Sequence, residues 1–174
     1  MIHVCSLLLF ALAALPCGRV RVNQQNQLRN CTLEADVKFA GAVIPKNSIV
    51  FFTSDGVIKK TFLARDTAIA GHVCRGGGDA WETGFYPSGR LRLCWLAKDE
   101  TIDGIPCRRA TILADVIGGR VGVWLHENGR LAHCEAATSF TVGSCRVKKG
   151  DTVNSDAAGN IGVRGVTCGR TSSH

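Results

Sequence analysis

The sequence predicts an all-β fold: an elongated array of about five β-hairpin repeat units, forming either one curved antiparallel sheet or a β-solenoid. Two observations lead to this prediction. The 174 residues include 20 glycines and only 4 prolines, and this much glycine is typical of turn-rich β structure rather than of helix bundles. In addition, a turn motif and a cysteine motif recur along the chain in a fixed order, which indicates stacked repeats.

The chain opens on an apolar segment, Val4 to Leu15. It is too short to cross a bilayer and has the length of the apolar region of a secretory signal peptide. Ala11-Leu12-Ala13 supplies a small-residue cleavage site. We therefore expect residues 1–16 to be a signal peptide and residues 19–168 to form a single β-repeat domain. The protein would be secreted, periplasmic or held at the cell envelope, with no integral membrane span; lipidation of Cys17 is an alternative.

The first motif of each unit is a turn followed by an apolar position and, in three units, a cysteine. We expect a strand on each side of the turn, and a glycine in it that adopts the positive φ of tight hairpin loops. Because Leu91, Leu93 and Leu96 do not share one parity, we also expect a bulge after the turn. The expected strands are Ile49–Phe52, Val57–Leu63, Gly84–Tyr86, Leu91–Leu96, Val121–Leu125 and Arg130–Ala136.

The second motif reads D-x-x-I-x-G-x-x-C and occurs twice with identical spacing, from Asp66 to Cys74 and from Asp99 to Cys107. Asp36 to Gly41 keeps its first six positions, and Thr141 to Cys145 reads as a shortened copy. We expect each copy to form a bend and a short third strand that ends at the cysteine. The two motifs together predict units near residues 20–47, 48–80, 82–118, 120–151 and 152–168.

Nine cysteines occur in the chain without a CxxC pair, so the spacing of a zinc ribbon or a thioredoxin-type motif is absent. Cys31, Cys94 and Cys134 hold the same position in three units. They could be buried thiols or form disulfides. The candidate disulfides join them to one another along a solenoid ladder or to another cysteine such as Cys74, Cys107 or Cys145. Cleavage after Ala13 would leave eight cysteines, an even number that suits four disulfides.

The net charge is +7, from 21 Lys and Arg against 14 Asp and Glu, and a basic surface attracts anionic partners. Arg29, Lys59 and Arg92 hold the same position in three successive units. We predict that they form a basic binding stripe; the alternative is a solvated sheet edge whose charges oppose aggregation. The expected partners are an anionic polymer, an anionic lipid surface or a protein, and nucleic acid is not expected.

Asp36, Asp66 and Asp99 also recur at one position. They could form a carboxylate ladder for Ca²⁺, but side-chain capping of a turn is the simpler interpretation, because aspartate readily accepts backbone N–H bonds there. We predict neither a metal site nor a cofactor.

Candidate catalytic residues are few. His126 and His133 flank a turn and could be cross-strand neighbours beside Cys134, although no acidic residue recurs with them. We predict a non-enzymatic protein. The alternative is a small secreted enzyme or inhibitor with its site around His126 to Cys145.

The hairpin half of the unit resembles the MORN-variant repeats of bacteria, whose units read roughly Tyr-x-x-Gly-x-Leu. Phe85 to Leu91 (Phe-Tyr-Pro-Ser-Gly-Arg-Leu) and Trp124 to Leu131 (Trp-Leu-His-Glu-Asn-Gly-Arg-Leu) carry the resemblance. It covers about half of each unit between Ile49 and Ala136, and the D-x-x-I-x-G-x-x-C half departs from it. The resemblance implies a string of antiparallel hairpins that binds or scaffolds rather than catalyses.

Overall fold

The structure, a computed structural model, describes residues 15–24, 28–111 and 122–170. In these ranges the chain forms 19 strands and no helix, so the predicted all-β class is confirmed. No helix there is long and apolar enough to cross a membrane. The expected signal peptide lies outside the described residues except for its last two. Leu15, the first described residue, packs partly buried against the core.

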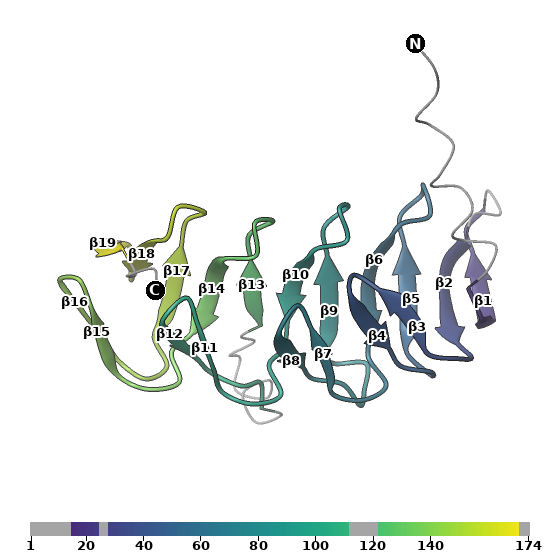
Figure 1. The fold of residues 1–174 in the computed structure, drawn as a ribbon, viewed down its shortest axis with the longest axis horizontal. Coiled ribbons are helices and arrows are strands. Elements are labelled where there is room, and N and C mark those ends of the chain that lie inside the picture. Colours follow the sequence, from purple (N-terminus) through teal and green to yellow (C-terminus); the bar gives the residue numbers. More distant parts are fainter. Residues whose placement is uncertain (1–14, 25–27, 112–121, 171–174) are drawn as a thin grey trace, which may run out of the picture.

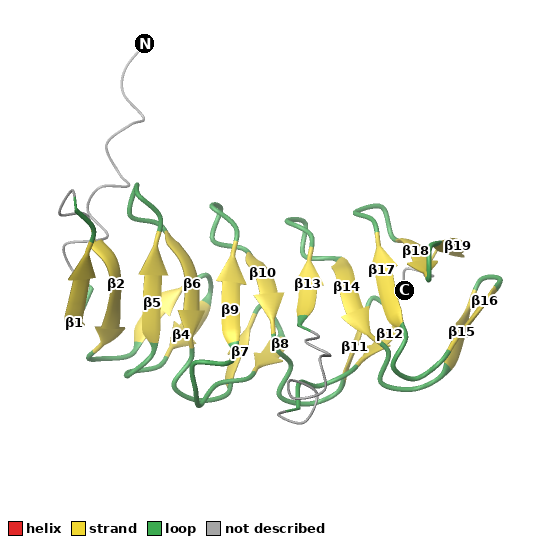
Figure 2. Ribbon diagram, turned by 180° about the vertical axis from the view of Figure 1, so that it is seen from behind, coloured by secondary structure: helices red, strands yellow, loops and turns green. Residues whose placement is uncertain are grey.

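Eleven of these described strands make one antiparallel sheet, and they follow one another along the long axis of the molecule (Figures 1 and 2). In spatial order they are β1 (Cys17–Val22), β2 (Leu28–Leu33), β5 (Ile49–Phe52), β6 (Ile58–Phe62), β9 (Glu82–Phe85), β10 (Leu91–Cys94), β13 (Val123–Leu125), β14 (Leu131–Glu135), β17 (Thr152–Ser155), β18 (Asn160–Val163) and β19 (Val166–Arg170). The strands of the large sheet therefore lie side by side in the order in which the chain forms them. The strands expected from the sequence lie within a few residues of the observed ones.

The other eight strands form four small two-stranded hairpins. They are β3 (Val37–Phe39) with β4 (Ala42–Ile44), β7 (Thr67–Ile69) with β8 (His72–Cys74), β11 (Glu100–Ile102) with β12 (Ile105–Cys107), and β15 (Phe140–Val142) with β16 (Cys145–Val147). Each small hairpin follows one pair of large-sheet strands and precedes the next. The small hairpins lie on one side of the sheet and form a second layer (Figure 1).

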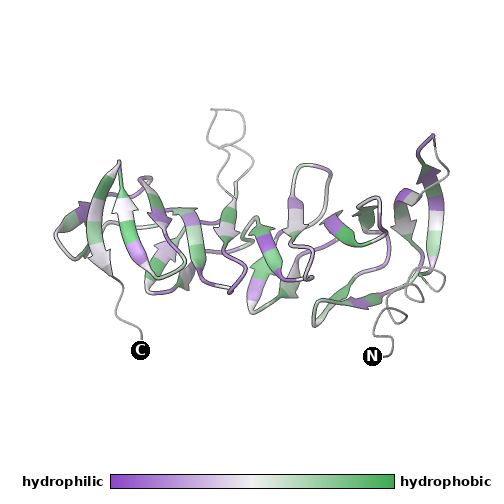
Figure 3. Cartoon of the chain, turned by 90° about the horizontal axis from the view of Figure 1, so that it is seen from above, coloured by the Kyte–Doolittle hydropathy of each residue, from purple (hydrophilic) through white to green (hydrophobic). Residues whose placement is uncertain are grey.

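The core lies between the two layers. Alternate residues of the large sheet, such as Val50, Leu125 and Leu131, are buried and meet Ile44 and Ile105 of the small hairpins. From above, apolar and polar residues alternate along several strands (Figure 3). Alternation places one face of the large sheet against the core and leaves the other to solvent. We call the solvent-facing side of the large sheet the outer face.

The D-x-x-I-x-G-x-x-C motif differs from the expectation of a bend with one strand. It forms a complete hairpin, with Thr67 opposite Cys74 and Ile69 opposite His72. The turn residues Ala70 and Gly71 have φ of 52° and 88°. Two successive positive φ values reverse the chain within two residues, which leaves room for a strand on each side. Asp103 and Gly104 repeat this turn in the next copy.

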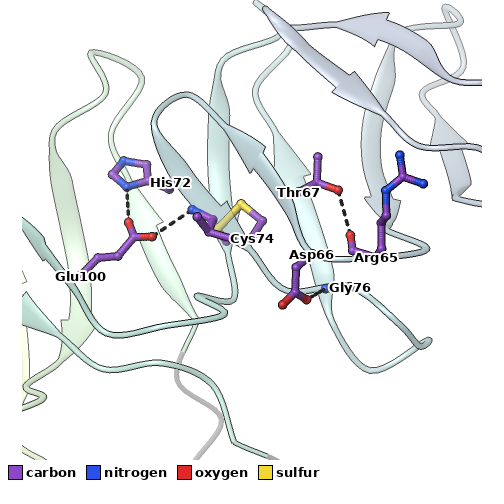
Figure 4. Close-up of a disulfide and its surroundings, with 9 residues drawn as sticks. Arg65, Asp66, Thr67, His72, Cys74, Gly76 and Glu100 are labelled. Carbon is purple, nitrogen blue, oxygen red and sulfur yellow. Dashed lines mark hydrogen bonds and ion pairs between the residues drawn. A yellow bond between two sulfur atoms is a disulfide. The ribbon is translucent and has the colours of Figure 1, made fainter.

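The recurring aspartates cap these hairpins. Oδ1 of Asp66 accepts a hydrogen bond from the backbone N–H ten residues later, at Gly76, over 2.9 Å (Figure 4). Asp36 and Asp99 make the same bond to Lys46 and Arg109. The three carboxylates therefore accept backbone N–H bonds as expected, but across the open end of the hairpin and not within the turn.

The fourth small hairpin has full length, so the interpretation of Thr141 to Cys145 as a shortened copy is wrong. Oγ of Ser139 accepts the backbone N–H of Lys149, again ten residues away, and so replaces the capping aspartate. In this hairpin Val147 lies opposite Phe140, as Cys107 lies opposite Glu100 in the preceding one. The cysteine has moved two residues earlier, which hid the match in the sequence.

Eight described cysteines form four disulfides: Cys17–Cys31, Cys74–Cys94, Cys107–Cys134 and Cys145–Cys168. Three of them join a small hairpin to the large sheet, and Figure 4 shows the one at Cys74. The disulfide alternative is thus confirmed, but the bonds do not link equivalent cysteines of successive units. Disulfides persist in oxidising compartments, so these bonds are consistent with an extracytoplasmic location. Cys5 lies outside the described residues.

Candidate functional site

The three predicted binding residues share one structural position, a β-bulge in the second strand of a hairpin. In β10, Leu91 and Leu93 face Phe85 and Gly84, which leaves Arg92 as the extra residue. Lys59 is the extra residue of β6 and Arg29 that of β2. The expected bulge after the turn is therefore confirmed, and it is the feature that carries the cations.

Arg92 lies on the outer face. Its guanidinium carbon is 5.2 Å from the centre of the Trp124 ring, and Trp124 projects outward because its strand neighbours Val123 and Leu125 are buried in the core. The guanidinium also reaches across Gly84, where a Cβ would come within 3.2 Å of Nη2. The absence of a side chain at Gly84 gives Arg92 the space to lie flat on the sheet.

Lys59 and Arg29 are both exposed. One hairpin separates Arg29 on β2 from Lys59 on β6, and another separates Lys59 from Arg92 on β10. In the described part of the chain, neither these two residues nor Arg92 forms an ion pair. The structure thus places the three cations at equivalent, regularly spaced positions with their charge uncompensated.

Aromatic rings accompany the cations on the outer face. The register aligns Phe51, Lys60 and Gly84 in one row, which continues through Leu93 to Trp124. Lys60 Nζ lies 5.0 Å from the centre of the Phe51 ring and is also paired with Glu82. Trp124 is 38% exposed and the phenylalanine half-buried. The face therefore offers flat rings beside positive charge.

Sequence reasoning did not single out these aromatic residues. Trp124 and Phe51 lie on different hairpins, and only the cross-strand register brings them into one row with the bulges. A signal was present: Phe51 lies between the buried residues Val50 and Phe52, and Trp124 lies between Val123 and Leu125, which is the pattern of an outward-facing ring.

Two further arginines, Arg90 and Arg130, connect neighbouring hairpin turns. Nη1 of Arg90 donates to the carbonyl oxygen of Glu127 over 2.8 Å, and Nη1 of Arg130 donates to that of Ala158 over 3.1 Å. Each arginine follows the glycine of a hairpin turn and holds the next turn along the sheet. Tyr86 reinforces this contact through a bond to the carbonyl of Leu125. These residues set the spacing of the hairpins.

The residues of the alternative enzyme site do not converge. His126 Nε2 donates to the carbonyl oxygen of Ser155, and His133 Nδ1 lies 2.9 Å from Oδ1 of Asn154. The cross-strand partner of His133 is Trp124, not His126. Both cysteines in this region form disulfides and so carry no nucleophilic thiol. Among the described residues, no cluster of three or more His, Cys, Asp or Glu could hold a metal ion.

His72 lies at the rim of a groove of about 560 Å³ between the turns of the two layers. Its Nδ1 is 3.1 Å from Oε2 of Glu100, whose other oxygen accepts the backbone N–H of Val73 (Figure 4). This contact joins two successive small hairpins. Because the nearby Cys74 is bonded to Cys94, His72 has no thiol to activate.

No family model, no curated protein and no solved structure matches this chain.

Proposed function

We propose that the protein is an exported, non-enzymatic β-repeat protein that binds an anionic partner at the cell envelope or outside the cell. The candidate partners are an anionic polymer, an anionic lipid surface or a protein. The observation that carries the proposal is the row of bulge cations, Arg29, Lys59 and Arg92, which occur in three successive hairpins without ion-pair partners among the described residues. Uncompensated charge of one sign attracts ligands of the other.

We also propose that the fold is an array of about five hairpin units, which resemble MORN-variant repeats. The support for this array is the alternation of large-sheet strand pairs with small hairpins along the chain. Units that stack in a row present the same residue position at a regular interval. Such an arrangement suits an extended partner, which can contact several units at once.

We further propose that the protein is exported and that its N-terminal apolar segment is cleaved off. Export is supported by the four disulfides, because such bonds rarely form in a reducing cytosol. The intact mass of the protein from its host, with and without alkylation, tests it. A mass that begins near Ala14, with no alkylated thiol, is expected; a full-length mass with many alkylated thiols would contradict export.

Chromatography on heparin tests whether the bulge cations bind an anionic partner. The variant Arg29→Gln, Lys59→Gln, Arg92→Gln is compared with Lys38→Gln, Arg109→Gln, Arg146→Gln, which removes the same three charges. The control residues are exposed and lie in or beside the small hairpins. Both variants lower the net charge equally, so a difference between them reports position rather than total charge.

We expect the wild-type protein to elute at a higher salt concentration than the outer-face variant, and the control to elute close to the wild type. Equal losses in the two variants would mean that total charge alone drives retention. Unchanged retention of the outer-face variant would remove the basic stripe as the binding site.

A further inference from the structure

The spacing of the bulge cations along the sheet constrains the ligand. Neighbouring strands lie about 4.8 Å apart, so one hairpin advances the sheet by about 9.6 Å. Arg29, Lys59 and Arg92 are separated by one hairpin each, and their backbone positions therefore repeat at this interval. A ligand that engages all three must lie across the strands and carry negative charge at a similar interval.

A stacked nucleic acid strand fits this interval poorly, since its phosphates follow one another at about 3.4 Å. An extended polysaccharide with one uronic acid in every disaccharide fits better, because one disaccharide has a length close to one hairpin. Its carboxylates would then meet the bulge cations in turn, while the neutral sugars between them lie over the sheet.

The outer face also offers what a sugar ring needs besides charge. A pyranose has one largely apolar C–H face, which packs on flat aromatic side chains. Trp124 is 38% exposed beside the guanidinium of Arg92, so an aromatic surface and a carboxylate-binding group meet at one point. Phe51 lies on the same row, within the hairpin that carries Lys59.

We propose that the ligand is an acidic polysaccharide of alternating uronic acid and neutral sugar residues, bound across the strands of the outer face. The cations Arg29, Lys59 and Arg92 bind its carboxylates, and Trp124, one strand beyond Arg92, stacks on the neutral sugar that follows. This inference rests on the proposed anion-binding function and specifies its ligand.

Binding to three probes separates charge from sugar recognition. Isothermal titration is carried out with a hyaluronan decasaccharide, with a pentaglutamate peptide that carries five side-chain carboxylates, and with a six-nucleotide oligothymidylate. The proteins are the wild type, the triple glutamine variant of the bulges, Trp124→Leu and Trp124→Phe. Leucine keeps an apolar side chain without a ring, and phenylalanine keeps a ring. Circular dichroism and the count of alkylatable thiols check that each variant folds.

We expect the hyaluronan fragment to bind at least about tenfold more tightly than the peptide or the oligonucleotide, and Trp124→Leu to remove about tenfold of this affinity. The same substitution should leave binding of the peptide within about twofold, and Trp124→Phe should retain most of the glycan affinity. The triple glutamine variant should no longer bind any of the three probes.

Three results would overturn the proposal. If all three probes bind equally and Trp124→Leu affects them alike, or if the oligonucleotide binds most tightly, the glycan inference fails while the proposed anion-binding function stands. If no probe binds to the wild-type protein, the glycan inference fails, and an anionic polymer is removed from the candidate partners of the proposed function.

Discussion

The guanidinium of Arg92 lies 5.2 Å from the centre of the Trp124 ring, across the junction of two successive hairpins. Arg92 is the extra residue of a bulge, and Trp124 is the cross-strand partner of the next residue, Leu93. The bulge thus delivers a cation to an exposed ring of the neighbouring hairpin.

This pair should contribute modestly to stability. A cation–π contact at an exposed site is worth about 0.5–1 kcal/mol. We expect a double-mutant cycle of Arg92→Gln and Trp124→Leu, measured by urea unfolding, to give a coupling energy of that size. Arg29→Gln is the control, since it removes a bulge cation that has no ring contact among the described residues. A coupling energy near zero would show that the stacked geometry does not persist in solution.

The Cys74–Cys94 disulfide has a counterpart without cysteines one unit earlier in the chain. Ile44 and Thr61 hold the corresponding positions there and are almost fully buried. Cys74→Ala with Cys94→Ala should lower the free energy of unfolding by about 3 kcal/mol, because the bond closes a loop of 20 residues.

Cys74→Ile with Cys94→Thr should restore about 1–2 kcal/mol of that loss, since the isoleucine refills the space with buried apolar surface. Guanidinium unfolding of both variants measures the difference. An Ile and Thr variant no more stable than the alanine variant would contradict the equivalence of the two positions.

The capping bond of Asp66 should be replaceable by serine. Asp66→Ala removes the acceptor for the backbone N–H of Gly76 and should cost about 1 kcal/mol. Asp66→Ser should cost less, since Ser139 makes the same bond in the fourth small hairpin. Thermal unfolding measures both, with Asp79→Ala as a control at an exposed aspartate of the same connection. Equal losses for alanine and serine would show that the bond itself does not matter.

Asp151 should titrate at low pH. A hydrogen bond from the backbone N–H of Lys148, followed by one from Arg164, lowers the pKa of its carboxyl below the ordinary value. The bonds favour the ionised form, so their contribution to stability is present above the unfolded pKa of about 3.9 and is lost as the pH falls through the lower folded pKa.

An NMR titration of the carboxyl carbons tests this, with Arg164→Gln for comparison. The variant should raise the pKa of Asp151 only partway to the ordinary value, because the stronger cause, the Lys148 amide, remains. A complete return to the ordinary value would mean that Arg164 alone holds the carboxylate.

Much of the hairpin layer was predictable from local signals. Glycine at the turns and the broken parity of Leu91, Leu93 and Leu96 located the strands and the bulge, because turn conformation and strand alternation depend on neighbouring residues. The small hairpins were harder. Ala70 adopts a positive φ of 52°, which its residue type disfavours, so the motif looked like a bend rather than a two-residue turn.

Features that depend on register could not be predicted in the same way. The partner of Cys94 is fixed by how β8 lies over β10, not by the distance between cysteines along the chain. The meeting of Arg92 and Trp124 likewise depends on the alignment of β10 with β13. The recurring position of the three cations was visible in the sequence, whereas the aromatic rings beside them became visible only through cross-strand pairing.

Lysine footprinting shows whether the outer face binds the anionic partner. The folded protein is acetylated with and without a heparin oligosaccharide, and each lysine is quantified by mass spectrometry. The ligand should protect Lys59 on the outer face and leave Lys38 and Lys149, in and beside the small hairpins, as reactive as before. Protection of Lys38 or Lys149 with Lys59 unprotected would contradict it.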